Sequence, residues 1–328
     1  MSYYDKKPFE KGSFCILSNL RNYLNYYGLA VSEAWLGGII GYMGFFYTKN
    51  PIATKEVIHG RSGSFEYMFQ CLQQLLENPL KYLKVKADAN VAKEVGRVLS
   101  EYKLMLVWLN DFYLEYSPYY KLGEFWSLAI LSEVQDSKAV IFDNGFKELS
   151  CDTFLQAVNC NGEGRFYYTT ENCLNWSESE RTLLLNGFSR TVARLENKIE
   201  DEGEFYGICG IENFAEDLSK CRDLEKIYGF YFQMNRPGGL ALSRENMKKV
   251  FIQMEAKGFA YQVNEAVMIY EKLSEGWRKI ACLLFKLSNS EDLSLRGRIV
   301  ERVYEMLEYE KKGLMAIKAL TGYLEGVR

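Results

Sequence analysis

Cys15 is the residue of this chain whose type and position most clearly suit chemistry. It lies in Ser13-Phe14-Cys15, where Ser13 can cap a helix and Cys15 falls in the first turn. Aligned peptide dipoles at a helix start favour negative charge, so we expect the thiol to tilt toward thiolate. A cysteine nucleophile also needs an adjacent base, normally histidine. The chain has 1 histidine, His59, which lies outside the expected position of that base.

Other polar residues admit both a chemical and a structural interpretation. His59 precedes residues 60–63, a predicted turn, which favours a surface histidine over a catalytic one. Asp111 ends an apolar strand, where it could face a ligand or cap a turn. Tyr116 belongs to a cluster of tyrosines that could line an acceptor pocket or fill the core.

The elements that must position Cys15 follow from the spacing of apolar residues. Residues 16–27 have helical spacing, and Gly28 ends that helix. Ser32 opens a second helix whose glycines lead into a strand at 45–47. After a loop at 50–63, the pattern predicts helices at 64–77, 90–102 and 151–158 and strands at 80–85, 104–109, 125–134 and 139–142. The last three strands are continuously apolar, which predicts central strands of an α+β domain.

The pattern changes near residue 177, after which helical periodicity dominates. We predict helices at 178–199, 207–219, 224–234, 243–257, 264–287 and 294–320. The change of pattern predicts two domains, an α+β domain at 1–170 and an α-helical domain at 171–328.

Composition excludes several classes of function. A net charge of −3 without a basic run argues against nucleic-acid binding. The 8 cysteines form no Cys-x-x-Cys pair, which argues against a metal site. We expect no signal peptide and no membrane span, because the first residues are polar and no apolar run is long enough. Reduced thiols in a cytoplasmic protein are the simplest expectation.

Several segments resemble the butirosin biosynthesis protein H family. That family opens with His-Cys, a helix, a Tyr-Gly turn and a Ser-Glu helix, and residues 14–33 are similar to this start. A glycine-rich run into an aromatic strand is matched by residues 38–47. Residues 107–116 and 139–143 look like its two strands that end in aspartate. The family's helical domain is matched by residues 205–208, 211–218, 236–239 and 276–281.

The resemblance implies a papain-like domain followed by a helical domain. Family members are thiol acyltransferases of natural-product biosynthesis, which move an acyl group from the phosphopantetheine thioester of an acyl or peptidyl carrier protein to a small-molecule amine. We expect no bound cofactor, with the phosphopantetheine thioester as the possible acyl donor, and the composition argues against a metal. Cys15 takes the nucleophile position and Asp143 that of the orienting acid. The base histidine position falls on Phe125 or Trp126, neither of which can accept a proton.

Two interpretations follow from the missing histidine. Either the chain is a cysteine acyltransferase, or it is a degenerate homologue that binds a pathway metabolite or partner protein. Activity would need a substitute for this histidine. Glu124 or a His59 that swings in could act as the base, or the helix dipole alone could lower the pKa of the thiol enough for reaction. The expected helical domain would close the cleft or support a homodimer. The predicted substrate-binding residues are Glu33, Tyr47, Asp111, Tyr116, Glu124 and Trp126.

Overall fold

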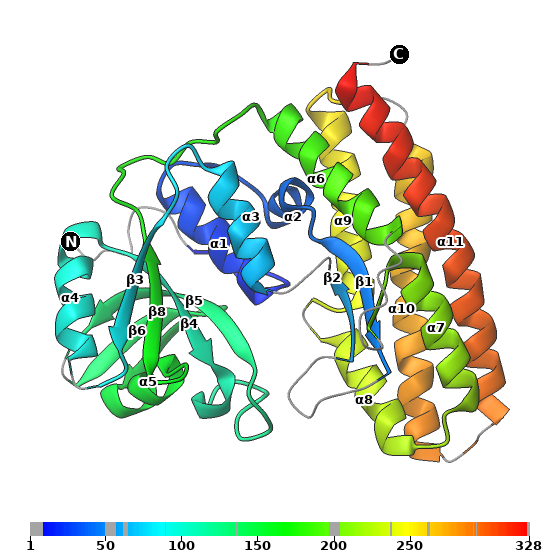
Figure 1. Ribbon diagram of the computed structural model, residues 1–328, viewed down its shortest axis with the longest axis horizontal. Coiled ribbons are helices and arrows are strands. Elements are labelled where there is room, and N and C mark those ends of the chain that lie inside the picture. The colour runs from blue at the N-terminus through cyan, green and yellow to red at the C-terminus, as the bar shows by residue number, and fades with distance from the viewer. Residues whose placement is uncertain are drawn as a thin grey trace. The chain divides into compact units, whose positions relative to one another are not determined.

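The chain forms two compact units that each draw on two separate stretches of sequence (Figure 1). The computed structural model describes residues 9–49, 57–61, 65–88, 90–135, 137–196, 204–236, 238–260, 263–290, 292 and 294–326. Unit 1 comprises Met1–Glu33 and Gln73–Ser177, and unit 2 comprises Ala34–Leu72 and Glu178–Arg328. The units therefore differ from the predicted division at residue 170 chiefly in residues 34–72, which belong with the helices of the second half.

Unit 1 is built on an antiparallel sheet of 6 strands in the order β3-β8-β4-β5-β6-β7. The strands are β3 (Lys81–Lys86), β4 (Met105–Asn110), β5 (Trp126–Val134), β6 (Lys138–Phe142), β7 (Phe146–Ser150) and β8 (Glu163–Tyr168). Its helices are α1 (Cys15–Tyr26), α4 (Val91–Tyr102) and α5 (Cys151–Val158). Helix α3 (Phe65–Leu75) runs across the boundary between the units.

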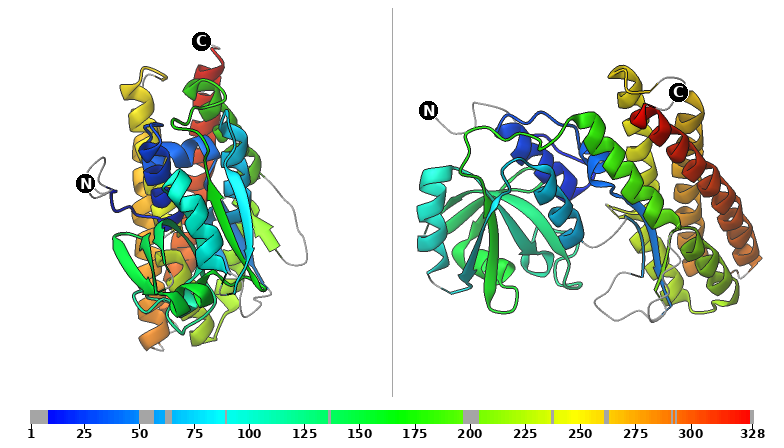
Figure 2. Two further views of the ribbon diagram at one scale, coloured as in Figure 1. Left: turned by 90° about the vertical axis from the view of Figure 1, so that its left-hand side faces the viewer. Right: turned by 45° about the horizontal axis from the view of Figure 1, so that its top comes forward.

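The two faces of this sheet carry different helices because side chains alternate along each strand. Met105, Val107 and Leu109 point into one core with residues of α4 and α5. Helix α1 packs on the other face against β5, where Asn19 Nδ2 donates to the carbonyl of Leu128 at 2.6 Å. Both ribbon views agree that α1 and α4 lie on opposite sides of the sheet (Figure 2).

Three strand ends meet at one edge of the sheet. β4 ends at Asn110, which is in register with Trp126 at the start of β5. β6 runs antiparallel to β5 and ends at Phe142, so Asp143 follows at the same edge. A short 3-10 helix begins directly at Asp111. The topology thus brings Asp111, Trp126 and Asp143 to one end of unit 1, although they are far apart in sequence.

Unit 2 is mostly helical, with a small antiparallel sheet in the order β2-β1-β9. Its strands are β1 (Met43–Thr48), β2 (Ile58–Arg61) and β9 (Glu204–Tyr206). Its helices are α2 (Glu33–Ile40), α6 (Glu180–Glu196), α7 (Gly207–Lys220), α8 (Leu224–Asn235), α9 (Leu240–Ala256), α10 (Asn264–Ser290) and α11 (Ser294–Glu325). None of the described helices is both long and apolar enough to cross a bilayer.

A buried ion pair ties the helices of unit 2 to its small sheet. Arg244 Nε lies 2.8 Å from Glu310 Oε1, and both side chains are fully buried. Arg244 Nη1 donates to the carbonyl of Gly44 in β1 at 2.6 Å. Trp277 Nε1 donates to the same Glu310 oxygen at 2.7 Å. One arginine therefore connects α9, α11 and the β1–β2 hairpin.

The predicted helices lie within a few residues of those observed, but some strands were missed. β7 and β8 were not predicted, because neither has a continuous apolar run. β9 lies in the half that was predicted to be helical only. β2 falls within the predicted loop at 50–63, of which residues 50–56 and 62–64 lie outside the described residues. His59 is consequently a buried strand residue, and its predicted surface position was wrong.

Candidate functional site

Cys15 is the first residue of α1, as the sequence predicted, but Ser13 does not cap the helix. Phe14 occupies the N-cap position and makes no side-chain capping bond. The Ser13 hydroxyl instead donates to Glu33 Oε1 at 2.6 Å. Cys15 is partly exposed, whereas Phe14 and Ile16 on either side are each only 1 % exposed.

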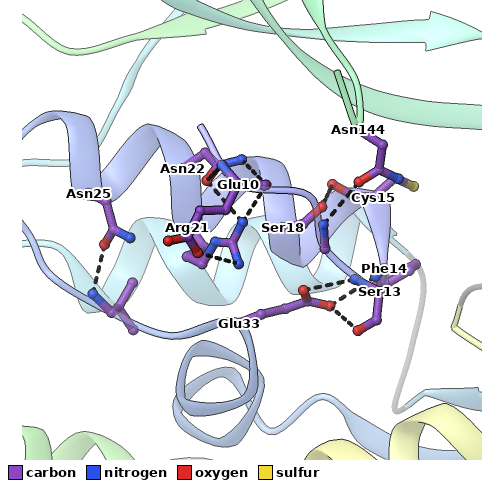
Figure 3. A network of polar contacts seen from close by, with 12 residues as sticks. Glu10, Ser13, Phe14, Cys15, Ser18, Arg21, Asn22, Asn25, Glu33 and Asn144 are labelled. Atoms are coloured by element: carbon purple, nitrogen blue, oxygen red, sulfur yellow. Dashed lines mark hydrogen bonds and ion pairs between the residues drawn. The ribbon is translucent and has the colours of Figure 1, made fainter. Parts of the chain in front are cut away.

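Glu33 holds the segment that leads into Cys15 (Figure 3). Its carboxylate accepts the N–H of Ser13 at 3.0 Å and that of Phe14 at 2.9 Å, besides the Ser13 hydroxyl. Asn144, directly after Asp143, accepts the N–H of Gly12 at 3.0 Å. Glu33 was predicted to bind substrate, and the structure places it as the group that fixes the turn before α1.

The thiol of Cys15 is held in its protonated form. Although the residue keeps some exposed surface, its sulfur is surrounded by protein atoms, and this burial is the largest cause that raises its pKa, followed by the negative charges of Asp143 and Asp111. The N–H of Ile16 hydrogen-bonds to the sulfur and lowers the pKa, but these causes outweigh it. The expected tilt toward thiolate is therefore reversed, because the helix dipole is weaker than burial combined with two nearby carboxylates.

Asp143 lies beside Cys15 at the end of β6, as predicted. Tyr116 Oη donates to its Oδ2 at 3.2 Å, and Asn19 of α1 also hydrogen-bonds to this carboxylate. Burial raises the pKa of Asp143, while the positive charge of Lys147 acts in the opposite direction. The ammonium of Lys147 lies 5.2 Å from the centre of the Tyr116 ring. Asp143 thus contacts hydroxyl and amide donors instead of an imidazole.

Asp111 is the second carboxylate that acts on the thiol. Its side chain accepts the hydroxyl of Ser127 at 2.7 Å, and its N–H donates to the carbonyl of Phe125 at 2.7 Å. Asp111 is 7 % exposed, and burial raises its pKa to about 7, with a further contribution from Asp143. A carboxyl group that titrates near neutrality can exchange protons at physiological pH.

Two tyrosines complete the group of residues around the sulfur. Burial raises the pKa of Tyr116, helped by the charges of Asp143 and Asp111. Burial also raises the pKa of Tyr119 to about 12, and Cys15 and Asp111 add to this effect. We refer to Cys15, Asp111, Tyr116, Tyr119 and Asp143 as the Cys15 cluster.

The two positions proposed for the lost histidine flank the Cys15 cluster. The Phe125 ring lies 4.6 Å from that of Tyr119 between centroids. Trp126 is half-buried at the start of β5. Glu124, predicted as a substitute base, is exposed in the preceding turn, and the carboxylates that act on the thiol are Asp143, Asp111 and Glu33. Asp111 is therefore better placed than Glu124 to exchange a proton with Cys15.

His59 and Tyr47 belong to unit 2 and are engaged there. His59 is 6 % exposed and stacks on Phe46 with ring centroids 4.7 Å apart. Burial lowers its pKa to about 3, which keeps the imidazole neutral. Tyr47, predicted to bind substrate, is fully buried and donates to Asp217 Oδ2 at 2.7 Å. The predicted movement of His59 toward Cys15 is incompatible with this packing, because its ring is buried against Phe46.

Sequence reasoning missed three residues of this site. Asn19 follows Cys15 by one helical turn, so an i, i+4 pattern on α1 could have identified it. Ser127 lies opposite Leu109 in the β4–β5 pair and its hydroxyl reaches Asp111 just beyond the end of β4, a contact that depends on strand pairing and is not visible in the sequence. Lys147 belongs to β7, where it pairs with Ile141 of β6, and β7 was not predicted. No group of three or more metal-ligating side chains occurs among the described residues.

Comparison with known proteins does not assign this chain to a family. Among protein-family models and curated proteins alike, none matches this chain. The chemical interpretation of the Cys15 cluster therefore depends on its residues and their contacts.

Proposed function

We propose that this protein is a papain-like relative of the butirosin biosynthesis protein H family that binds an amine-bearing metabolite without covalent turnover. The observation that carries the proposal is the environment of Cys15, whose sulfur faces Asp143 and Asp111 where the family resemblance implies an imidazole. A thiol near two carboxylates loses nucleophilicity, because thiolate formation would add a third negative charge.

The papain-like part of the proposal is supported by the arrangement of α1 and the sheet. In papain-like enzymes a helix presents the cysteine at its start, and antiparallel strands present the other catalytic groups. Here α1 begins at Cys15 and packs on β5, while Asp143 follows β6. The same spatial relation between a helix start and neighbouring strand ends is expected of this ancestry.

An amine ligand is favoured by the charges and rings of the Cys15 cluster. Asp111 and Asp143 can each accept hydrogen bonds from an ammonium group, and such charge-assisted bonds are strong. Tyr116 and Tyr119 supply aromatic faces, which also attract cations. Because Asp111 has a pKa of about 7, we expect amine binding to strengthen as the pH rises from 6 to 8.

The proposal is tested by mass spectrometry and calorimetry on the full chain. We expect no acyl adduct on Cys15 after incubation with carrier-protein thioesters of varied acyl groups. Putrescine should bind, Asp111→Asn should weaken that binding about tenfold at pH 8, and Cys15→Ala should leave it intact. Glu77→Gln is the matched control. An acyl adduct on Cys15 would contradict the proposal, as would equal putrescine affinity of the wild type and Asp111→Asn.

Acyl transfer is the second candidate, and the pKa of Asp111 near 7 favours it specifically. In that reaction the Asp111 carboxylate would take the Cys15 proton as the sulfur attacks the thioester carbonyl. The phosphopantetheine sulfur would leave with that proton, and the acyl group would remain on Cys15. An amine would then attack the acyl group, lose a proton to Asp111 and release the protonated thiol. An adduct in wild-type protein that disappears in Asp111→Asn would support this candidate.

A further inference from the structure

A cavity of about 400 Å³ lies in unit 1 at the end of α1 that is remote from Cys15. It is formed where α1 ends, where α4 ends and where the chain leaves β8. Cys15 begins α1 and Tyr26 ends it, so about 17 Å of helix separates the two locations. The lining residues are Tyr26, Tyr27, Glu101, Tyr102, Lys103, Thr169, Thr170, Glu171 and Asn172.

Three tyrosines, Tyr26, Tyr27 and Tyr102, are among the residues that line the cavity. Tyr26 and Tyr27 lie edge to face with centroids 5.1 Å apart. The Tyr102 ring stacks on that of Tyr168 with centroids 5.1 Å apart, a contact that restricts its orientation. Aromatic walls of this kind attract cations, because the faces of the rings carry partial negative charge.

Negative charge converges on the same cavity. Glu101 and Glu171 contribute carboxylates, and the Tyr102 hydroxyl hydrogen-bonds to Glu101. Helices α1 and α4 both end here, and neither has a basic residue in its last turn. The C-terminal end of a helix carries partial negative charge, so both ends add to that of the carboxylates. Lys103 is the single cation among the lining residues.

The walls of the cavity are fixed by hydrogen bonds within unit 1. Tyr27 Oη donates to the carbonyl of Tyr102, which connects α1 to the end of α4. Thr169 N–H donates to the hydroxyl of Tyr23 at 2.9 Å, and Glu171 N–H donates to Thr169 Oγ1 at 3.0 Å. The site is thus preorganised, so a ligand would lose little binding energy to ordering it.

We propose that this cavity is a binding site for a small organic ammonium compound. The cation would lie against the rings of Tyr26 and Tyr102, with Glu101 and Glu171 neutralising its charge. Threonine hydroxyls and the Asn172 amide would hydrogen-bond to polar groups of the ligand. The site is separate from the Cys15 cluster and does not depend on the function proposed for it.

The test compares choline with its neutral carbon isostere, 3,3-dimethyl-1-butanol, by calorimetric titration of the full chain. We expect choline to bind with a dissociation constant of about 1 mM and the neutral compound at least about tenfold more weakly. Exchange of both carboxylates in Glu101→Gln/Glu171→Gln should weaken choline binding about tenfold. Tyr102→Phe should keep most of the affinity and Tyr102→Ala should lose it, since only the second removes the ring.

Glu77→Gln, which removes an exposed carboxylate outside both sites, serves as the control and should bind choline like the wild type. Circular dichroism of each variant verifies that it is folded. Equal binding of choline and the neutral compound would overturn the proposal, as would no choline binding up to about 20 mM. Loss of choline binding in Asp111→Asn, with no change in the double glutamine variant, would place the ammonium site at the Cys15 cluster and would also overturn it.

Discussion

Asp111 is a carboxyl group that the fold holds at a pKa near neutrality. Burial raises its pKa from 3.8 to about 7, although Ser127 and Ser117 donate hydrogen bonds that favour the ionised form. The folded state therefore holds a proton that the unfolded state releases between pH 4 and 7. Stability must fall with rising pH across this window, because the folded state binds more protons than the unfolded state.

We predict that Asp111→Asn stabilises the protein at pH 8 and not at pH 4. Asparagine can accept the Ser127 hydrogen bond without a buried charge, so the gain at pH 8 should be roughly 2–4 kcal/mol. Urea unfolding at both pH values measures the free energy of unfolding. Parallel pH dependence in wild type and variant would show that Asp111 has an ordinary pKa.

The sequence located the acids of this site better than it predicted their effect. Both aspartates were expected at strand ends, Asp143 as the acid partner of Cys15 and Asp111 as a ligand-facing or turn-capping residue, and the antiparallel register brings both strand ends together. The protonation of Cys15 could not be predicted, because it depends on burial that only the assembled unit creates. Glu124 was the carboxylate predicted as a substitute base, and Asp111 was not considered for that role, since spacing along the chain does not reveal which side chain turns inward.

At the scale of elements, the start of α1 depends on a residue from the start of α2. The Glu33 carboxylate accepts three hydrogen bonds, two from the N–H and hydroxyl of Ser13 and one from the N–H of Phe14. Phe14 is the N-cap residue, whose N–H has no partner within the helix. This arrangement replaces the serine cap expected from sequence. These hydrogen bonds fix the conformation of the segment that precedes Cys15, and with it the direction in which α1 begins.

We predict that Glu33→Ala lowers the free energy of unfolding by about 1–3 kcal/mol, because three hydrogen bonds are lost. Glu33→Gln should lose less, since its amide oxygen can still accept the bonds made to Oε1. Glu148→Ala, which removes an exposed carboxylate from β7, is the control. The interpretation of Glu33 is wrong if its alanine variant differs from wild type by less than about 0.5 kcal/mol.

Helices were easier to predict than strands because their periodicity is local. The amphipathic helices α4, α5 and α7 match their predicted ranges closely. β7 alternates between exposed and inward-facing residues over only 5 positions, and β8 contains Gly164, so neither stands out from a loop. A strand whose partners lie far away in sequence gains its stability from pairing, which a local pattern does not reveal.

At the scale of the whole molecule, the chain passes between its two units three times, after residues 33, 72 and 177. Residues 34–72, which include strands β1 and β2, belong to the helical unit 2. There β9, from the second half of the chain, pairs with β1. The predicted boundary at residue 170 assumed that neighbouring elements share a domain. The position of β1 in unit 2 involves partners far away in the sequence, such as Arg244, which donates to the Gly44 carbonyl. The local pattern of apolar residues carries no information about such partners.

We predict that Arg244→Met destabilises the protein by about 3–5 kcal/mol. The variant leaves the buried Glu310 without its guanidinium partner and removes the Arg244 donor to the Gly44 carbonyl. Arg278→Met, at an exposed arginine of α10, is the matched control, and thermal and urea unfolding provide the measurement. The double variant Arg244→Met/Glu310→Met should regain part of the loss, because no unpaired charge remains. If Arg244→Met were as stable as the control Arg278→Met, the role assigned to Arg244 would be contradicted.

The pH dependence of Cys15 alkylation is the direct test of the neutral thiol on which the proposed function depends. Wild type, Asp111→Asn and Asp143→Asn are treated with iodoacetamide from pH 6 to 10, and modification of each cysteine is measured by mass spectrometry, with exposed Cys282 as the internal reference. We predict that Cys15 reacts more slowly than Cys282 throughout and that each variant accelerates it about three- to tenfold. A Cys15 rate that reaches its plateau at or below pH 7 would contradict the account, because it would show a stable thiolate beside two carboxylates.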